Sequence, residues 1–305
     1  MKEISLDLVR VTEAAAIAAA SWVGSGNKEA ADKAATEAMR KRLNQMEFTA
    51  RIVIGEGKKD KSEGLFAGEV VGKLIKTENI RYALAVDPID GTRPTVTSGP
   101  EAMSVIAVAE EGALFSTSEF YMNKLAYGPE IAKKIELNLN DPLSRTIKLV
   151  SATAGKDVSK ITVCLLDRPR HEKLIKELHQ IGVRIKLIQD CDISGAIACC
   201  LADSGIDLLY GIGGAPEGVI TACAMKCLKG GFQAQVVKKD GTPIEEKIYS
   251  MEDLVRGECA FAATGVTTGS LLRGVRFSSQ GAVTNSVFMR SESGTVRWLT
   301  VYHGN

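Results

Sequence analysis

The sequence predicts an α/β (α+β) protein, and two patterns carry this prediction. After residue 145, three strand-like segments each meet a polar loop and then a helical segment; before it, two alanine-rich helical segments precede several short apolar strands. Alternating strands and helices favour a largely parallel sheet covered by helices, with ligands at the carboxyl ends of the strands. With 305 residues and 45% hydrophobic side chains, the chain can form two closely packed halves, which we expect at 1–145 and 146–305.

Composition excludes several classes of protein. The 38 basic and 37 acidic side chains give a net charge of +1, so no overall field attracts nucleic acid or an anionic membrane. Charged residues near the start, among them Asp7 and Arg10, argue against a secretory signal, and no apolar run approaches the roughly 20 residues that span a bilayer. Seven cysteines without zinc-ribbon spacing indicate reduced thiols, as in a cytoplasmic protein.

Two helices are expected in the first part of the chain. The first, at 5–22, has apolar residues at helical spacing; the second, at 28–46, follows the capping residue Asn27 and has one apolar face. Lys28 and Asp32 share another face of the second helix, one turn apart. A surface ion pair and a phosphate-binding helix start explain these two residues equally well.

The strand expected at 51–54 ends in Glu56, which stands between two glycines, and Asp60 follows in a very polar loop. A carboxylate flanked by glycines leaves room for a bulky ligand and lets the backbone approach it. The lysines of this loop are typical of a solvated segment, although they would also attract an anion.

The strand expected at 82–86 ends in a denser group of polar residues. Because proline cannot donate to a ladder, Pro88 is expected to end the strand and leave Asp87 extended, while Gly91 allows a sharp turn. Asp87 and Asp90 then converge, and paired carboxylates suit Mg²⁺ or Mn²⁺ together with phosphate oxygens. Taken alone, the same residues are also typical of an ordinary strand-to-turn junction.

The rest of the chain is expected to add mainly strands. A hairpin is predicted from 103–109 and 113–115, and the segment with Tyr121 and Lys124 is expected to be irregular. Further strands are predicted at 161–166, 183–188, 207–210, 232–237 and 259–263, with a hairpin over 283–302 and helices that end near residues 181, 201 and 228.

Acidic side chains recur at strand ends and helix starts. They are Asp32, Glu56, Asp60, Asp87, Asp90, Asp190, Asp192 and Glu217. Carboxylates gathered in this way repel one another unless cations lie among them, so we expect a site for more than one metal ion. Arg168 and Arg170 favour phosphate as the shared ligand. The glycine-rich stretch at 211–218 is not a dinucleotide fingerprint, because Pro216 takes the place of the third glycine; Pro216 and Glu217 instead suit the first turn of a helix.

Residues 87–92 resemble the signature of the lithium-sensitive, metal-dependent sugar and inositol phosphatases. Further segments look like class II fructose-1,6-bisphosphatase and run in family order over nearly the whole chain. These segments are 11–15, 54–57, 121–124, 168–171 and 210–218.

The resemblance implies a layered αβαβα sandwich of two closely packed halves, with most metal ligands on the first half. It implies hydrolysis of the 1-phosphate of fructose 1,6-bisphosphate to fructose 6-phosphate, a reaction of gluconeogenesis, with Mn²⁺ or Mg²⁺ and more than one ion per site. The implied metal ligands are Asp32, Glu56, Asp87 and Glu217. The implied pair that positions and deprotonates the attacking water is Asp60 and Thr92. The implied substrate-binding residues are Lys28, Asp90, Gly91, Thr92, Tyr121, Arg168, Arg170, Asp190, Asp192 and Gly214.

The chain departs from the family pattern at three places. It has Asp90 where the family usually has Glu, Arg168 where it has Lys, and the lysine-rich segment 58–61 where it has an acidic loop with a proline. These departures leave the implied ligand set intact and bear on metal preference, affinity and regulation.

Other functions fit part of the pattern. Sedoheptulose 1,7-bisphosphate presents a similar phosphorylated head, so it is an alternative or additional substrate. A non-catalytic sensor of sugar phosphates would keep the pocket, but it has no need of a water-activating pair such as Asp60 and Thr92. His171 in the basic loop is a further candidate for phosphate contact. A homodimer or homotetramer without nucleic-acid or membrane partners is expected.

Overall fold

The computed structural model describes residues 4–56, 64–75, 79–116 and 120–304. Met1–Ser116 and Val255–Asn305 make one compact unit, and Thr117–Leu254 make a second one. This division differs from the expected boundary at residue 145, because strands from both ends of the chain belong to the same sheet. The second unit is thus an insertion in the chain of the first. Asp60 and the lysines beside it lie outside the described residues.

Eight described strands form the sheet of the first unit. They are β1 (Ala50–Ile54), β2 (Val70–Val71), β3 (Tyr82–Asp90), β4 (Met103–Glu110), β11 (Cys259–Gly265), β12 (Arg276–Ser278), β13 (Gly281–Arg290) and β14 (Thr295–Gly304). Their order is β12, β13, β11, β4, β3, β1 and β2, with β14 paired to β13. β1 and β3 run parallel, and the other neighbours run antiparallel.

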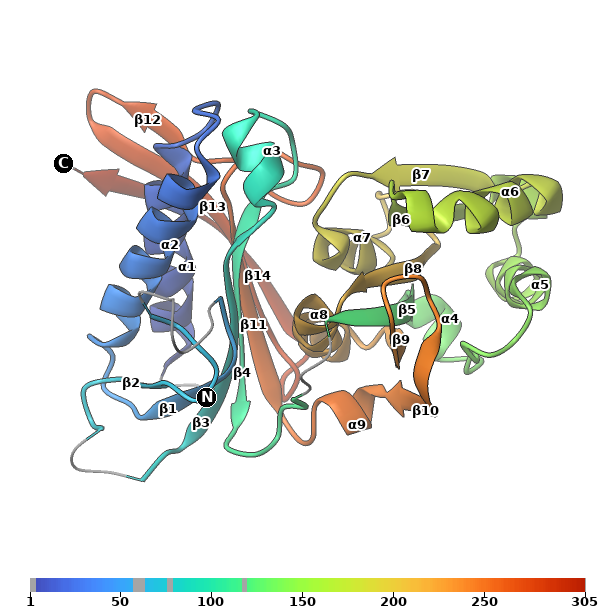
Figure 1. Cartoon of the computed structure of the whole chain (residues 1–305), viewed down its shortest axis with the longest axis horizontal. Coiled ribbons are helices and arrows are strands. Elements are labelled where there is room, and N and C mark those ends of the chain that lie inside the picture. The colour runs from blue at the N-terminus through green and yellow to red at the C-terminus, as the bar shows by residue number, and fades with distance from the viewer. Residues whose placement is uncertain (1–3, 57–63, 76–78, 117–119, 305) are drawn as a thin grey trace. The chain divides into compact units, whose positions relative to one another are not determined.

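Helices α1 (Ser5–Ala20) and α2 (Lys28–Leu43) lie side by side on one face of this sheet (Figure 1). Their apolar faces bury Leu8 and Met39 against Ile52 and Ile106 of the sheet. The predicted cap is confirmed, since the Asn27 side chain accepts a hydrogen bond from the Ala30 N–H at 3.1 Å. Both helices end two or three residues before their predicted ends.

β3 does not stop at Pro88, which corrects the expectation that proline would end it. The strand runs on to Asp90 because a β-bulge interrupts its pairing with β4 at Pro88, which has no N–H to donate. Asp87 pairs with Val105 and Asp90 with Met103, so β3 has one residue more than β4 between these pairs. Gly91 then takes φ = +100°, as a sharp turn requires, and α3 (Thr92–Val96) begins at the next residue.

The hairpin expected after β4 does not form. Residues 113–115 make no ladder with β4; Leu114 instead forms an isolated bridge with Val255. Both neighbours of β4 are already present, since β3 and β11 pair with it on either side. Because both hydrogen-bonding edges of β4 are occupied, no third strand can pair with it.

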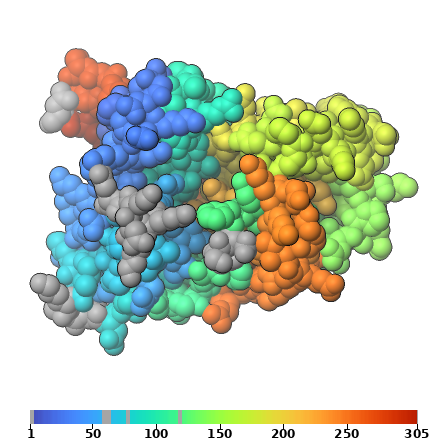
Figure 2. Space-filling view, viewed as in Figure 1, coloured from blue at the N-terminus to red at the C-terminus, as the bar shows by residue number. Residues whose placement is uncertain are grey.

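Six described strands form the sheet of the second unit. In spatial order they are β10 (Pro243–Ser250), β9 (Gly231–Val237), β5 (Tyr121–Tyr127), β8 (Leu208–Gly214), β6 (Thr162–Leu166) and β7 (Arg184–Ile188). β6 is parallel to β7 and β8, and the remaining pairs are antiparallel. The sheet is mixed and not largely parallel as expected, because the segment predicted to be irregular is β5, a central antiparallel strand. β10 and β7 are the two edge strands of this sheet, and β10 is visible in orange in Figure 2.

Helices cover both faces of this second sheet (Figure 1). α8 (Ala215–Leu228) and α7 (Asp192–Ala198) pack on one face, and α5 (Leu143–Ala154) and α6 (Glu172–Ile181) contribute to the apolar cluster on the other. Shorter turns are α4 (Pro129–Ala132), η2 (Val158–Lys160), η3 (Pro169–His171) and α9 (Met251–Leu254). The α/β class is confirmed: one unit has a helical layer on a sheet, and the other a sheet between two helical layers.

Candidate active site

Acidic residues lie toward the carboxyl ends of the parallel strands β1 and β3 in the first unit's sheet. These strands are parallel, and their register pairs Ile54 with Ala85, so Glu56 and Asp87 each follow two residues after that pair. Glu56 is exposed, and the Asp87 carboxylate accepts a hydrogen bond from the Ile89 N–H at 3.0 Å across the bulge. The bulge therefore fixes the direction of Asp87 at the point where the strand leaves regular pairing.

The side chains of Asp32, in the second turn of α2, and Thr92, the first residue of α3, are in contact. The Thr92 hydroxyl donates a hydrogen bond to Asp32 Oδ1 at 2.7 Å. Burial raises the pKa of Asp32, while the Thr92 hydrogen bond and the charge of Lys28 act in the opposite direction. Ionisation of a half-buried carboxylate is costly unless a cation lies beside it, so Asp32 is suited to bind a metal ion.

Asp90 and Gly91 form the turn that aims α3. Asp90 is 6% exposed, at the end of β3. Gly91 caps α3, and its carbonyl accepts a hydrogen bond from the Thr95 hydroxyl at 2.9 Å. The left-handed backbone at Gly91 is what allows Thr92 to open a helix immediately after the strand.

Glu217 lies in the first turn of α8 in the second unit, where its position was predicted. Pro216 occupies the preceding helix position. The Oε2 atom of Glu217 is buried and accepts no hydrogen bond from any described residue. Burial raises the pKa of Glu217, Lys124 lowers it and Asp192 raises it. Gly214 makes this placement possible, since a Cβ atom there would overlap the Glu217 carboxylate.

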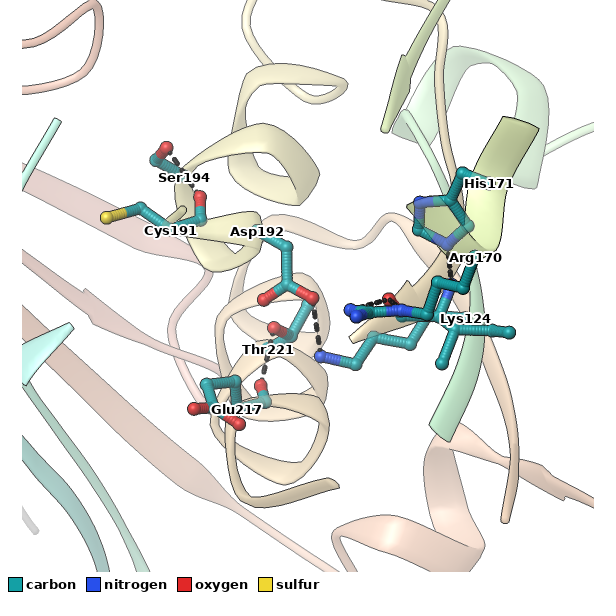
Figure 3. Close-up of polar contacts among 9 residues, drawn as sticks. Lys124, Arg170, His171, Cys191, Asp192, Ser194, Glu217 and Thr221 are labelled. Atoms are coloured by element: carbon teal, nitrogen blue, oxygen red, sulfur yellow. Dashed lines mark hydrogen bonds and ion pairs between the residues drawn. The ribbon is translucent and has the colours of Figure 1, made fainter. Parts of the chain in front are cut away.

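Lys124 is a residue of this site that sequence reasoning left without a role. It is fully buried on β5 and donates a hydrogen bond to Asp192 Oδ2 at 2.7 Å (Figure 3). Two glycines leave room for it: Cβ atoms at Gly213 and Gly218 would approach its side chain. A sequence pattern could have predicted its burial: Lys124 alternates along the strand with Met122 and Ala126, two apolar residues that share its face.

The predicted sugar-phosphate residues occupy loops at the ends of β6, β7 and β8. Arg168 and Asp190 form an ion pair. The Arg170 guanidinium donates from Nε and Nη2 to the Ile212 carbonyl, at 3.1 and 2.7 Å, and its Cζ lies 5.5 Å from the centre of the Tyr121 ring. Arg170 is thus anchored on one side and stacked on the other, which orients its remaining N–H groups.

His171 does not have a nitrogen to offer to phosphate, which corrects that expectation. Its Nε2 accepts the Ile212 N–H at 2.8 Å, which is the dashed line from the His171 ring in Figure 3, and its Nδ1 lies 2.7 Å from the Leu166 carbonyl oxygen. These partners require the neutral ring with a proton on Nδ1. Burial lowers the pKa of His171, consistent with that neutral form. The ring ties the end of β6 to β8.

The predicted ligand residues have side chains whose chemistry suits metal binding. Asp32, Glu56 and Asp87 belong to the first unit and Glu217 to the second, and all offer carboxylate oxygens, the donors that Mg²⁺ and Mn²⁺ favour. The unsatisfied Oε2 of Glu217 fits such a role. Within the described parts of the chain, no three His, Cys, Asp or Glu side chains are grouped closely enough to form a metal site. Across the same residues, no helix is long and apolar enough to cross a membrane.

Comparison with known proteins assigns a family. Residues 2–303 match the family described as bacterial fructose-1,6-bisphosphatase, glpX-encoded. A protein from Trichodesmium erythraeum, named D-fructose 1,6-bisphosphatase class 2/sedoheptulose 1,7-bisphosphatase, is 40% identical over 98% of this chain and 96% of its own length. A protein of the same name from Crocosphaera subtropica is 38% identical over the same shares.

Solved structures show weaker likeness. An inositol monophosphatase from Anabaena matches 83% of this chain and 93% of its own, with 13% identity and a TM-score of 0.37. The assignment comes from the sequence relatives, which span both units. By its match over nearly the full length and its identity to these relatives, the chain belongs to the glpX-encoded bacterial fructose-1,6-bisphosphatase family.

Proposed function

We propose that this chain removes the 1-phosphate of fructose 1,6-bisphosphate, giving fructose 6-phosphate and inorganic phosphate, with Mn²⁺ or Mg²⁺ as cofactor. The observation that carries the proposal is the family match over residues 2–303. The carboxylates and basic loops described above are the residue types that this reaction needs. Phosphate monoester hydrolysis is among the slowest uncatalysed reactions, so such a site has to supply up to ~10²¹-fold acceleration.

The proposed metal ligands are Asp32, Glu56, Asp87 and Glu217, holding more than one ion. When bound, the ions would lower the pKa of water and neutralise charge on the phosphoryl oxygens. Among these ligands, the chain presents two carboxylates, Asp32 and Glu217, whose ionisation is costly without a cation. The raised pKa values of Asp32 and Glu217 support this part of the proposal.

Thr92 and Asp60 are the proposed pair that positions the attacking water and takes its proton. The Thr92 hydroxyl donates its hydrogen to Asp32. Toward a water molecule it therefore offers only acceptor lone pairs, which orient the water by one of its O–H bonds. Asp60 would accept the proton as general base, while attack proceeds in line with the departing sugar oxygen.

The distal phosphate and the sugar are assigned to the loops of the second unit. Arg168 and Arg170 would bind the phosphate that is not transferred, so that its binding energy orients the reacting one. The ion pair with Asp190 and the stacking on Tyr121 restrict the two guanidinium groups before substrate arrives. Lys28, Asp90, Gly91, Asp192 and Gly214 complete the proposed substrate contacts.

Sedoheptulose 1,7-bisphosphate is a second candidate substrate. The named relatives carry both activities in their names, and the support for this chain is its 38–40% identity to them. We further propose a cytoplasmic homodimer or homotetramer. The seven cysteines are thiols in the structure, which is consistent with a reducing compartment.

Phosphate release from the two bisphosphates, with and without each metal, tests the proposal. Thr92→Ala and Asp60→Asn should each abolish turnover and leave sugar-phosphate binding largely intact, as measured by calorimetry. Near-normal turnover in either variant would remove that residue from water activation. Intact binding without turnover in the unmodified protein would instead favour a sugar-phosphate sensor.

A further inference from the structure

β14 is a ten-residue edge strand of the first unit's sheet (Figure 1). It pairs antiparallel with β13 from Thr295, opposite Arg290, to Gly304, opposite Gly281, without a register shift. β11 and β12 pair with β13 from its other side, and no described strand pairs with the outer edge of β14. None of the ten residues of β14 is buried. The outer edge therefore offers backbone N–H and C=O groups to another strand over about 33 Å.

The other described edge strands are shorter or carry features that discourage pairing with another chain. β2 and β12 have two and three residues. β10 begins with Pro243 and has charged residues at 245–247, and β7 contains Arg184 and Lys186. Proline and charged side chains protect an exposed edge from pairing. β14 has no proline and, apart from Arg297, no Asp, Glu, Lys or Arg, so its edge is suited to pair with another strand.

One face of β14 carries two exposed aromatic side chains. Trp298 is 52% exposed and Tyr302 is 79% exposed. They share this face with Thr300, which is also exposed, because side chains alternate along a strand. Leu299 on the opposite face packs against the apolar cluster of the same unit. Aromatic residues are enriched at protein interfaces, so the exposed face indicates a protein partner.

The sequence of β14 is complementary to itself in antiparallel pairing. With Thr300 opposite Thr300 of a second copy, Trp298 lies opposite Tyr302. A two-fold axis at Thr300 makes this aromatic pair occur twice. Pairs of aromatic residues and pairs of threonines are among the cross-strand combinations that stabilise antiparallel strands. An axis one residue away in either direction would place Trp298 opposite Thr300 or Gly304, so both aromatic pairs would be lost.

The other side chains of β14 are compatible with the same register. Leu299 lies opposite Val301, so two aliphatic side chains meet. Arg297 lies opposite His303, whose Nε2 is 4.0 Å from Glu13 Oε1 of its own chain. The two Arg297 residues are six positions apart along the paired strands, which is about 20 Å and exceeds the Debye length of about 8 Å at physiological salt. Their mutual repulsion is therefore small.

We propose that β14 pairs antiparallel with β14 of a second copy of this chain, about a two-fold axis at Thr300, so that the two sheets become continuous. The proposal rests on the self-association proposed above, for which it names the surface, and it is independent of the proposed activity. Because both copies contribute the same strand, one contact satisfies both edges, as a closed two-fold interface requires. In a homotetramer the same pairing would hold each of two dimers together.

Analytical ultracentrifugation of the full-length protein tests the proposal without substrate, so its outcome is separate from that of the phosphate-release assay. The unmodified protein should sediment as a dimer or tetramer. Thr300→Lys or Thr300→Glu places two like charges opposite each other at the axis and should raise the dissociation constant of the pairing at least about tenfold. Thr242→Lys is the matched control at an exposed threonine of the second unit, and it should leave the association unchanged.

An equal mixture of Thr300→Lys and Thr300→Glu tests the register. Opposite charges then face each other across the axis, so the mixture should associate more tightly than either variant alone. Because Thr300 is exposed, both variants should fold normally, and recovered association in the mixture would itself show that they are folded. Trp298→Ala removes both aromatic pairs and should also weaken association, whereas Tyr302→Phe keeps the rings and should not.

Three results would each overturn the proposal. A monomeric unmodified protein would leave this edge to a partner of another sequence. An oligomer that Thr300→Lys and Thr300→Glu do not alter would place the contact on another surface. A mixture that associates no more tightly than its two components would exclude the two-fold register at Thr300.

Discussion

Replacing Lys124 by methionine tests the buried ion pair of the second unit. The Lys124 side chain is 0% exposed, the Asp192 side chain is 8% exposed, and Nζ lies 2.7 Å from Oδ2. Methionine keeps the length and removes the charge. It therefore leaves Asp192 buried and uncompensated beside Glu217, whose pKa Asp192 already raises. Removal of one partner from a buried ion pair costs about 3–5 kcal/mol.

Urea unfolding followed by circular dichroism, with a chelator present, measures this loss. With a slope of about 3 kcal/mol per molar urea, the midpoint of Lys124→Met should fall by roughly 1 M or more. The matched control is Lys247→Met on β10 of the same sheet. Lys247 is 52% exposed and lies 3.1 Å from Asp253, so its loss should cost at most about 1 kcal/mol.

The double variant Lys124→Met/Asp192→Asn separates lost charge compensation from lost packing. With both charges removed, most of the stability should return, because replacing both partners is far less costly than leaving one unsatisfied. A loss under about 1 kcal/mol in Lys124→Met, or a double variant no more stable than the single one, would refute the assignment of this pair as a buried, mutually dependent unit.

Three further substitutions probe the site and the fold. Arg170→Ala should raise KM for a bisphosphate far more than for a monophosphate, and equal increases in steady-state assays would remove Arg170 from the distal phosphate. Gly214→Ala should weaken metal binding at least about tenfold in metal titrations of activity and thermal stability, because its Cβ would displace Glu217, whereas Gly304→Ala meets no neighbour and should change nothing. The pKa of His171 is lowered in the folded protein, so the contribution of the neutral ring to stability is fully present above the unfolded pKa of about 6.5. That contribution is lost as the pH falls from there through the lower pKa of the folded state. Between about pH 7.5 and 5.5 the unmodified protein should therefore lose more thermal stability than His171→Gln, and equal losses would contradict this role for the buried ring.

Local rules predicted the features that depend on neighbouring residues. Asn27 caps α2 because its side chain reaches an N–H three residues on, and Pro216 with Glu217 opens α8 because both suit a first helical turn. Gly91 was predicted to turn, and its φ of +100° shows the reason. In each case the determining contact lies within a few residues along the chain.

Tertiary contacts decided the features that were predicted wrongly. Pro88 is accommodated within β3 because β4 pairs on both sides of a bulge, which local sequence does not reveal. The segment with Tyr121 and Lys124 was expected to be irregular, yet it is β5, and Asp192 at the start of α7 pairs with the buried Lys124. His171 resembles a phosphate ligand in sequence, but its partners are two backbone groups of β6 and β8.

The measurement that tests the proposed activity most directly is phosphorus NMR of fructose 1,6-bisphosphate incubated with the purified protein, with and without Mn²⁺ or Mg²⁺ and after metal removal before recording. We expect the signal of the 1-phosphate to disappear only where metal was present, inorganic phosphate to appear in equal amount, and the 6-phosphate signal to remain. Loss of the 6-phosphate, turnover that persists with chelator, or no release with metal bound would each contradict the proposed reaction.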